Sequence, residues 1–415
     1  MSKVIKPHTD RSRLEEINQK LQKKVDELSR LLEERDLKTG GFDILPLTEL
    51  ILANSPAVLF RRLASVDPNK RKMVYVSPNI SIFGYSPEDF LGGKIMFRDI
   101  VYPGDSERTL DEIANFVEQG VENYTTTYRI ITGDGEIRWV EDQTSIYEDT
   151  STGLCYHQGI VIDIHEKKKA LQLAAEVQKS LLPERDPGVD GLDIAGKTLP
   201  CDEVGGDYFD FLPDSRGRTD TISIIIGDIS GHGVDAALLM ASARAFLRMR
   251  ASLSGSVENI VMALNRQLTE DMEKTGRFMT LFYLLIERHK NRINWVRGGH
   301  DPALLYDPYT DTFVELKGPG VALGFDKDQS YQLQRMDGLK QNQILILSTD
   351  GIYEASNQKG EMFGKERLKD IVRRNSSKTA EVILEQILED HFRFTTGVPR
   401  EDDITLIIVK ITPLN

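Results

Sequence analysis

Short apolar runs next to aspartates are the feature of this sequence that most restricts its fold. The run from Ile222 to Ile226 leads to Asp228, and the run from Ile344 to Leu347 leads to Asp350. Near-continuous apolar runs of this length, followed by Gly and Ser, predict strands that are buried on both faces. The sequence therefore predicts buried strands that carry carboxylates at their ends.

Two more aspartates occupy comparable positions. Asp402 precedes the apolar run at residues 404–409, and Asp207 follows Gly205-Gly206. A single aspartate at such a place commonly accepts hydrogen bonds from its own backbone and is only structural. Four carboxylates within about 5 Å of one another would instead repel by on the order of 20 kcal/mol, more than the stability of a typical domain. If the fold brings them together, either bound cations or protonation must offset the repulsion.

The available ligand atoms restrict the kind of cation. The chain has only two cysteines, Cys155 and Cys201, and few histidines. Oxygen-only sites select hard cations, so we expect two Mn²⁺ or Mg²⁺ ions rather than Zn²⁺. Two such ions about 4 Å apart can share a bridging water and hold a phosphoryl group for in-line attack. No Ser/His/Asp or Cys/His nucleophile arrangement stands out in this region, and this chemistry requires none.

The composition excludes several classes of protein. A formal net charge of −13 argues against a nucleic-acid-binding surface, which needs clustered Lys and Arg. The first ten residues lack the apolar core of a signal peptide, and no stretch reaches the roughly 18 apolar residues of a membrane span. Two cysteines are too few for a disulfide framework. We therefore expect a soluble protein of the reducing cytoplasm.

A length of 415 residues favours at least two globular domains. The sequence divides into an N-terminal helix (1–40), a first domain (45–165), a linker helix (166–183) and a second domain (184–415). In residues 11–38, leucines and isoleucines at heptad positions predict a short coiled coil and hence a homodimer. Three heptads are also compatible with a single amphipathic helix packed on the next domain.

The first domain alternates predicted strands with turns. Ser86-Pro87-Glu88-Asp89 supplies an N-cap, a proline at the first helical position and an acidic first turn, which predicts a helix start. Gly133-Asp134-Gly135 lies between two alternating runs and predicts a β-hairpin. Asp149 to Gly153 predicts a second turn before a final apolar strand.

Four motifs of this domain are typical of one family. They are Tyr75-Val76-Ser77-Pro78-Asn79, Phe83-Gly84-Tyr85-Ser86-Pro87-Glu88, Tyr102-Pro103-Gly104-Asp105, and the Gly-Asp-Gly hairpin that ends in Ile137-Arg138-Trp139-Val140. On these motifs the domain resembles a PAS sensor domain, which implies an antiparallel sheet with flanking helices. A flavin photosensor of this fold would need a reactive cysteine on a central helix, whereas Cys155 lies in a predicted strand. His157 is a lone strand histidine and indicates a structural residue more than a haem ligand, so the PAS ligand is left unassigned.

Residues 164–182 form a predicted helix that ends at Pro183. Apolar residues recur along it at heptad spacing with Gln178 in the seam, namely Ile164, Leu171, Ala174 and Leu181. A plain surface helix is one interpretation. The other is a helix that transmits a signal between the two domains and contributes to a dimer.

The second domain carries seven motifs in the order typical of another family. They are Glu176-Val177-Gln178-Lys179-Ser180-Leu181-Leu182-Pro183, Val204-Gly205-Gly206-Asp207-Tyr208-Phe209-Asp210, Ile226-Gly227-Asp228-Ile229-Ser230-Gly231-His232-Gly233, Phe278-Met279-Thr280-Leu281-Phe282-Tyr283, Gly299-His300, Ser348-Thr349-Asp350-Gly351 and Asp402-Asp403-Ile404-Thr405. On these motifs the domain resembles the PPM-type (PP2C-like) metal-dependent serine/threonine phosphatases. Within them it is similar to the bacterial sporulation and stress-response branch.

The resemblance implies an α+β fold in which an α-β-β-α sandwich of two antiparallel sheets follows the PAS domain. It also implies that Asp228 bridges two metal ions and that the Ile229 carbonyl binds one of them. Asp350 and Asp402 would bind the other ion, and Asp207 would bind directly or through water. These four carboxylates are the expected catalytic residues.

Some details of the implied site stay open. Asp403 takes a position often held by Asn, and Gly299 replaces the usual Ala before His300. His232 would act as a general acid, or its loop would only fix the backbone. The role of His300 and the occupancy of a third metal site are likewise open.

The resemblance implies a PAS-regulated phosphatase that dephosphorylates an anti-sigma-factor antagonist or a similar phosphoprotein. One alternative is a catalytically degenerate domain that serves as a signalling scaffold. Another is an enzyme that acts on a small phosphorylated metabolite. Residues 191–198 also fit the phosphate-loop pattern of nucleotide-binding proteins, but they run into Pro200 instead of a helix, so we interpret them as the first strand of the second domain.

Overall fold

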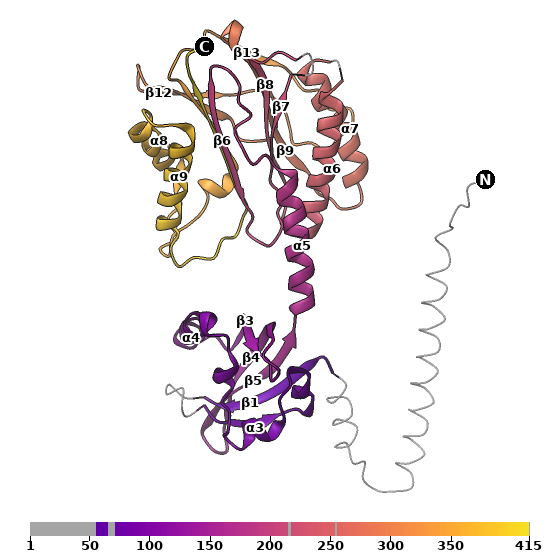
Figure 1. The fold of residues 1–415 in the computed structure, drawn as a ribbon, viewed down its shortest axis with the longest axis vertical. Coiled ribbons are helices and arrows are strands. Elements are labelled where there is room, and N and C mark those ends of the chain that lie inside the picture. Colours follow the sequence, from indigo (N-terminus) through magenta and orange to yellow (C-terminus); the bar gives the residue numbers. More distant parts are fainter. Residues whose placement is uncertain (1–54, 65–70, 215–216, 254, 415) are drawn as a thin grey trace, which may run out of the picture. The chain divides into compact units, whose positions relative to one another are not determined.

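The computed structural model describes residues 55–414, apart from 65–70, 215–216 and 254 (Figure 1). The chain divides into two compact units, residues 1–168 and 169–415. The predicted N-terminal helix and coiled coil, residues 1–40, lie outside the described residues. Within the described part, no helix is both long enough and apolar enough to cross a membrane.

The N-terminal unit is built on a five-stranded antiparallel sheet in the order β2-β1-β5-β4-β3. Its strands are β1 (Ala57–Leu63), β2 (Met73–Val76), β3 (Asn123–Ile131), β4 (Ile137–Asp149) and β5 (Leu154–Asp163). Its helical segments are η2 (Pro78–Phe83), α3 (Pro87–Leu91), η3 (Phe97–Ile100) and α4 (Pro103–Glu118). One apolar core, which includes Val58, Phe83 and Tyr128, packs η2, α3 and η3 against the sheet.

The local predictions for this unit are confirmed. Ser86 is the N-cap of α3, and its backbone N–H donates to the Asp89 carboxylate at 3.0 Å. Strands β3 and β4 pair antiparallel as far as Ile131 opposite Ile137, so the Gly-Asp-Gly segment is a hairpin turn. Cys155 lies in β5, as expected.

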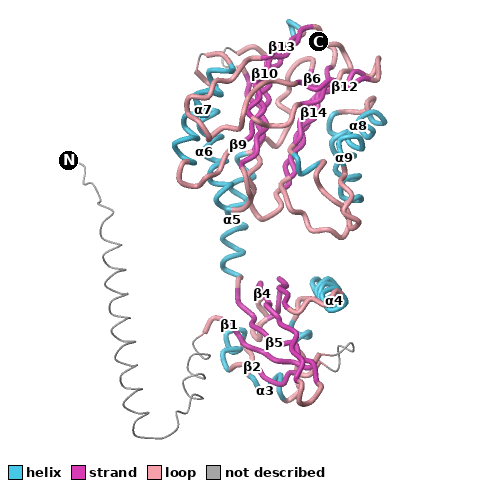
Figure 2. The backbone as a smooth tube through the Cα atoms, turned by 180° about the vertical axis from the view of Figure 1, so that it is seen from behind, coloured by secondary structure: helices cyan, strands magenta, loops and turns pink. Residues whose placement is uncertain are grey.

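The C-terminal unit contains two five-stranded antiparallel sheets (Figure 2). The first has the order β13-β10-β9-β8-β7, and its strands are β7 (Tyr208–Pro213), β8 (Thr221–Ile229), β9 (Met279–Glu287), β10 (Arg292–Gly298) and β13 (Gln334–Asp337). The second has the order β12-β11-β14-β15-β6, and its strands are β6 (Leu192–Leu199), β11 (Ala303–Asp307), β12 (Thr312–Leu316), β14 (Ile344–Ser348) and β15 (Ile404–Ile411). The segment that we interpreted as the first strand of this domain, rather than as a phosphate loop, is strand β6.

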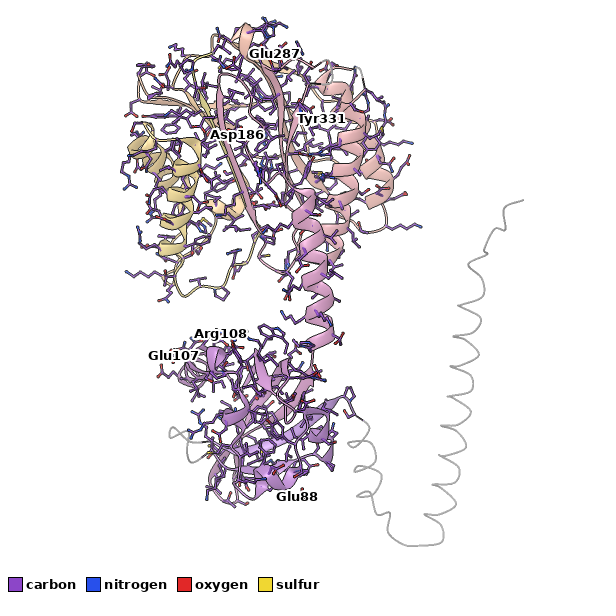
Figure 3. The ribbon with its side chains drawn as sticks, viewed as in Figure 1. Glu88, Glu107, Arg108, Asp186, Glu287 and Tyr331 are labelled. Carbon is purple, nitrogen blue, oxygen red and sulfur yellow. The ribbon has the colours of Figure 1, made fainter. Side chains whose placement is uncertain are left out.

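Side chains from the inner faces of the two sheets fill a shared core (Figure 3). Helices α6 (Val234–Ala251) and α7 (Val257–Met272) cover the outer face of the first sheet. Helices α8 (Gly364–Asn375) and α9 (Ala380–Phe394) cover the outer face of the second. These four layers are the α-β-β-α sandwich that the resemblance implied.

The packing of strand β8 explains why its sequence is largely apolar. Ile222, Ile224 and Ile226 point into the core between the sheets, whereas Ile225 and Ile229 pack beneath α6 and α7. Alternate residues of a strand point to opposite faces, and both faces of this strand are covered. A strand in such a position must be apolar at almost every residue.

Helix α5 (His165–Leu181) confirms the predicted linker helix. Most of its residues are exposed or half-buried, and Gln178 is its one buried residue. Gln178 is therefore the position at which this helix is held most closely by the rest of the C-terminal unit.

Candidate metal centre

The two sheets bring all the predicted carboxylates to one end of the sandwich. Asp207 directly precedes β7, whose first residue lies opposite Gly227, the neighbour of Asp228 in β8. In the other sheet, Asp350 follows β14, and Asp402 precedes β15. Antiparallel pairing places the start of one strand beside the end of its neighbour. Each sheet therefore contributes two carboxylates at the same end of its strands.

Hydrogen bonds across the sandwich join the two sheets at this end. The Thr349 hydroxyl donates to the Asp207 carboxylate at 2.9 Å. The Asp403 carboxylate accepts hydrogen bonds from the backbone N–H groups of Cys201 at 2.8 Å and Gly206 at 2.7 Å. Segments almost 200 residues apart in sequence are thereby fixed against each other at the site.

Gly205 is required by this close approach. A Cβ atom on Gly205 would lie 2.2 Å from the Asp403 carboxylate, so no side chain fits there. The Gly-Gly pair before Asp207 therefore has a steric reason to be present.

Mutual repulsion is evident in the pKa values of the carboxylates. Burial, and then the charges of Asp350, Asp402 and Asp403, raise the pKa of Asp228 to about 7. Burial and the charges of Asp228 and Asp403 hold the pKa of Asp207 well above its usual range. Burial also raises the pKa of Asp402, with a further contribution from Asp350. These groups lie close enough to oppose one another's ionisation.

The donor set fits hard divalent cations. Within the part of the chain that the structure describes, none of Asp207, Asp228, Asp350 and Asp402 forms an ion pair with Lys or Arg. Neighbouring carboxylates that lack a compensating cationic side chain supply the oxygen ligands that Mg²⁺ and Mn²⁺ prefer. The arrangement can therefore concentrate positive charge next to a bound phosphoryl group.

His232 lies at the rim of the site. Its Nδ1 atom lies 2.5 Å from the carboxylate of Asp202, and this hydrogen bond raises the pKa of His232. The Cys201 thiol completes a small cluster with these two side chains. Burial and the charge of Asp403 raise the pKa of Cys201 to about 12, so the thiol stays protonated and is a poor metal ligand. Sequence analysis missed Asp202, because no motif links it to His232.

His300 has a different environment. The side chain is buried, and its Nδ1 atom lies 2.8 Å from the Thr280 hydroxyl. Burial lowers the pKa of His300 to about 4, so the ring is neutral at ordinary pH. This environment suits a packing residue better than an exposed acid.

Helix α5 contacts the backbone next to Asp207. The Gln178 amide donates to the Gly205 carbonyl at 2.7 Å and accepts from the Gly205 N–H at 3.1 Å. The heptad pattern placed Gln178 in a seam but gave no sign of this partner. In the sequence, Gln178 stood out as a polar residue within an otherwise apolar seam and as part of the motif at 176–183, and neither feature indicates its partner.

A cavity of about 430 Å³ opens beside Asp402. Ser356, His391 and Arg400 are among the residues that line it. Arg400 is exposed and donates to the Pro200 carbonyl at 2.7 Å. A guanidinium so close to the carboxylates offers a contact for an anionic group that enters the site.

Comparisons with known proteins agree with this architecture. Residues 218–412 match the family described as Stage II sporulation protein E (SpoIIE), and residues 73–161 match the PAS fold. The SiaA-PP2C domain of Pseudomonas aeruginosa has the same fold as the C-terminal unit, with a TM-score of 0.51 and 24% identity over 59% of this chain and 97% of that one. The chain thus combines a PAS domain with a PP2C-like phosphatase domain of the SpoIIE type.

Two curated relatives come from Bacillus subtilis (strain 168). The phosphoserine phosphatase RsbU is 26% identical over 260 residues, which are 62% of this chain and 75% of that protein. The phosphoserine phosphatase RsbP is 28% identical over 191 residues, which are 45% of this chain but only 46% of that protein. By class, the chain is a phosphoprotein phosphatase, a hydrolase of the metal-dependent PP2C type.

Proposed function

We propose that Asp207, Asp228, Asp350 and Asp402 hold two Mn²⁺ or Mg²⁺ ions and that these residues are catalytic. Asp228 would be a ligand of both ions, and the Ile229 carbonyl would be a further ligand. The observation that carries the proposal is the position of these four carboxylates at the same end of the two sheets, with Asp207 tied to the second sheet by the Thr349 hydroxyl. Burial and three neighbouring carboxylates also raise the pKa of Asp228, to about 7. Divalent cations would relieve that repulsion at neutral pH.

The residues of the chain hold the site in position. Divalent cations at this site supply Lewis-acid activation of a phosphoryl group and of an attacking water. Asp403 fixes the 201–206 backbone, and Thr349 orients Asp207 through its hydroxyl. No side chain of the site needs to act as a nucleophile. The exposed His232, with its pKa raised by Asp202, is the available proton donor for a leaving seryl oxygen.

We infer that the substrate is a phosphoserine or phosphothreonine protein, and specifically an anti-sigma-factor antagonist. The inference rests on the likeness to RsbU and RsbP, both named as phosphoserine phosphatases. The open cavity with Arg400 beside Asp402 can accept a protein segment more readily than a closed pocket would. A PAS domain at residues 45–165 and a linker helix at 166–183 would regulate the phosphatase domain at 184–415.

The decisive test compares two aspartates at opposite ends of β8. The Asp228→Asn variant should lose Mn²⁺-dependent release of phosphate from a phosphoserine protein and from p-nitrophenyl phosphate. Asp220→Asn is the matched control, because Asp220 contacts His289 at the far end of the strand and should leave the rate nearly unchanged. Calorimetric titration with Mn²⁺ should show that Asp228→Asn also weakens metal binding.

The same experiment tests the two alternatives. A signalling scaffold predicts no turnover by the wild-type chain with any substrate. A metabolite phosphatase predicts turnover of small phosphate esters but none of a phosphorylated antagonist protein. Mn²⁺-independent activity would contradict the proposed site itself.

We further propose a cytoplasmic homodimer. Helix α5 and helix α6 expose Leu173, Val177 and Leu238, with exposed fractions of 63%, 57% and 67%. These side chains line one apolar groove in the C-terminal unit. Apolar side chains at this spacing on a helix of heptad character suit a second copy of the same helix. Cell fractionation tests the location.

A further inference from the structure

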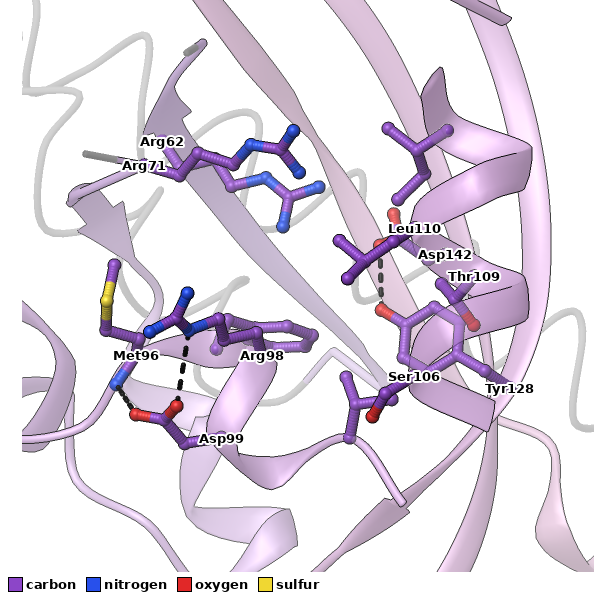
Figure 4. A pocket seen from close by; sticks show the side chains of 13 residues that line it. Arg62, Arg71, Met96, Arg98, Asp99, Ser106, Thr109, Leu110, Tyr128 and Asp142 are labelled. Atoms are coloured by element: carbon purple, nitrogen blue, oxygen red, sulfur yellow. Dashed lines mark hydrogen bonds and ion pairs between the residues drawn. The ribbon is translucent and has the colours of Figure 1, made fainter. Parts of the chain in front are cut away.

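The N-terminal unit contains a cavity of about 260 Å³ with a cationic wall. Arg62 of β1, Arg71 beside β2 and Arg98 of η3 all line it. Figure 4 shows the guanidinium groups of Arg62 and Arg71 side by side, on the side of the cavity that faces Tyr128 and Asp142. Two such groups repel each other, and an anion between them would remove that repulsion.

The two carboxylates of the cavity wall have other partners. Asp99 lies 3.4 Å from the Arg98 guanidinium and accepts from the Met96 N–H. Asp142 accepts from the Tyr128 hydroxyl at 2.8 Å and from the Thr144 hydroxyl at 2.6 Å. Both carboxylates are therefore held by hydrogen bonds or ion pairs that do not involve Arg62.

Arg62 supplies the observation that points to a ligand. Its Nε and Nη2 atoms are buried and, among the described residues, have no hydrogen-bond partner. These two atoms lie on the same edge of the guanidinium and donate in parallel, which matches the two oxygens of a carboxylate. A buried donor pair of this kind is costly unless a partner occupies it.

The field of the two arginines reaches a neighbouring histidine. Burial, followed by the charges of Arg62 and Arg71, lowers the pKa of His157 to about 4. Burial, followed by the charge of Arg62, likewise lowers the pKa of Arg71. The charge of Arg62 therefore opposes protonation of two of its neighbours.

The apolar part of the lining indicates that the ligand has an apolar part as well. Phe97, Val101, Leu110 and Ile113 contribute apolar surface to the cavity. An inorganic anion would leave this surface unused, whereas an aliphatic or aromatic group would bury it. We propose that the cavity binds a small organic carboxylate, with its carboxyl group on the Nε/Nη2 edge of Arg62 and its apolar body towards α4.

The test uses the full chain and pairs of probes that share an apolar body and differ in having a carboxylate or a neutral amide. Calorimetric titrations would compare benzoate with benzamide and hexanoate with hexanamide, with inorganic phosphate as an anion that lacks an apolar body. We expect saturable binding of at least one carboxylate, and binding of its amide weaker by about tenfold or more, since hydrogen bonds to charged groups contribute that much. Equal affinity for acid and amide, tighter binding of phosphate, or no binding of either carboxylate overturns the proposal.

Variants then locate the site. Arg62→Met keeps an unbranched apolar stem and removes the guanidinium group, and it should weaken carboxylate binding by about tenfold or more. Arg108→Gln is the matched control, because Arg108 lies on the exposed face of α4 (Figure 3) and pairs with Glu112 outside the cavity. Unchanged affinity in Arg62→Met contradicts the proposal.

A second measurement covers the case in which Arg62→Met does not fold. Arg71→Met should also weaken binding, and hydrogen exchange of the wild-type chain should show carboxylate-dependent protection in residues 57–63 and 103–118. Protection confined to the C-terminal unit would overturn the proposal. These outcomes do not depend on phosphatase activity, so they are independent of the proposed function.

Discussion

At the scale of single residues, Asp403 shows how a carboxylate can serve a metal site through the backbone alone. Its two oxygens accept from the N–H groups of Cys201, Gly206 and, at 3.3 Å, Asp207. The sequence placed Asp403 near the metals but gave it no partner. The structure gives it the role of fixing the turn that presents Asp207.

Asp403→Asn should therefore destabilise the C-terminal unit as well as slow catalysis. The amide keeps one acceptor and turns a donor towards a backbone N–H, so we expect a loss of about 1–3 kcal/mol in the free energy of unfolding. Urea denaturation of the full chain measures this. Asp326→Asn is the control, since this exposed carboxylate accepts only from the Asp328 N–H, and its loss should be smaller.

His157 makes the stability of the N-terminal unit depend on pH. Its folded pKa of about 4 lies below the value near 6.5 in unfolded chains, because burial and then two arginines oppose its protonation. Between these values the unfolded chain binds more protons, so stability falls as pH falls. The contribution of His157 to the free energy of unfolding is fully present above about pH 6.5 and is lost by about pH 4. The total loss is up to about 3 kcal/mol.

His157→Gln should remove this part of the pH dependence. Glutamine can still hydrogen-bond to the Tyr124 hydroxyl, which lies 2.8 Å from Nδ1 in the native protein. Hydrogen exchange of residues 154–163 at pH 7 and at pH 4.5 measures the difference. An equal loss of protection in the variant and the wild type would contradict the assignment.

At the scale of elements, one side chain joins helix α5 to the backbone next to the proposed metal site. Gln178 forms two hydrogen bonds with the backbone of Gly205, two residues before Asp207. A shift of α5 along its axis would break both bonds and release the turn. This contact is a physical means by which the helix position can affect the metal site.

Gln178→Ala should lower the phosphatase rate and raise the Mn²⁺ concentration needed for half-maximal activity. The reason is that the turn before Asp207 loses two hydrogen bonds and becomes less ordered. Gln172→Ala, at an exposed position of the same helix, is the control and should change neither quantity. A lower rate with an unchanged Mn²⁺ requirement would contradict an effect of Gln178 through the turn before Asp207.

At the scale of the whole molecule, the exposed apolar groove of α5 and α6 is the described surface on which the proposed dimer depends. Leu173→Glu together with Leu238→Glu should weaken the dimer, because each charge would be buried on association. The predicted coiled coil of residues 11–38 is unchanged in this variant, so the quantity to measure is the dimer dissociation constant, by analytical ultracentrifugation. Val382→Glu, an exposed apolar position on α9, is the control and should leave the dissociation constant unchanged. A double variant that dissociates at the same concentration as the wild type would contradict this interface.

Much of the fold followed from the sequence. The buried strands, the Gly-Asp-Gly hairpin, the start of α3 at Ser86 and the linker helix are local patterns, and local patterns are set by periodicity and turn chemistry. The convergence of Asp207, Asp228, Asp350 and Asp402 followed from the family resemblance. Spacing in sequence alone left open whether these aspartates meet.

The sequence could not determine the contacts between segments that lie far apart along the chain. No sequence motif indicates these contacts. They are the pairing of Gln178 with Gly205, the three N–H groups bound by Asp403, the Asp202–His232 pair and the unpartnered edge of Arg62. Each depends on how sheets and helices pack, and packing selects partners by shape and burial, without regard to order along the chain. The sequence by itself thus determined the strands, the helices and the type of metal ligand, whereas the tertiary structure decided which polar groups hold the site together and which are left for a ligand.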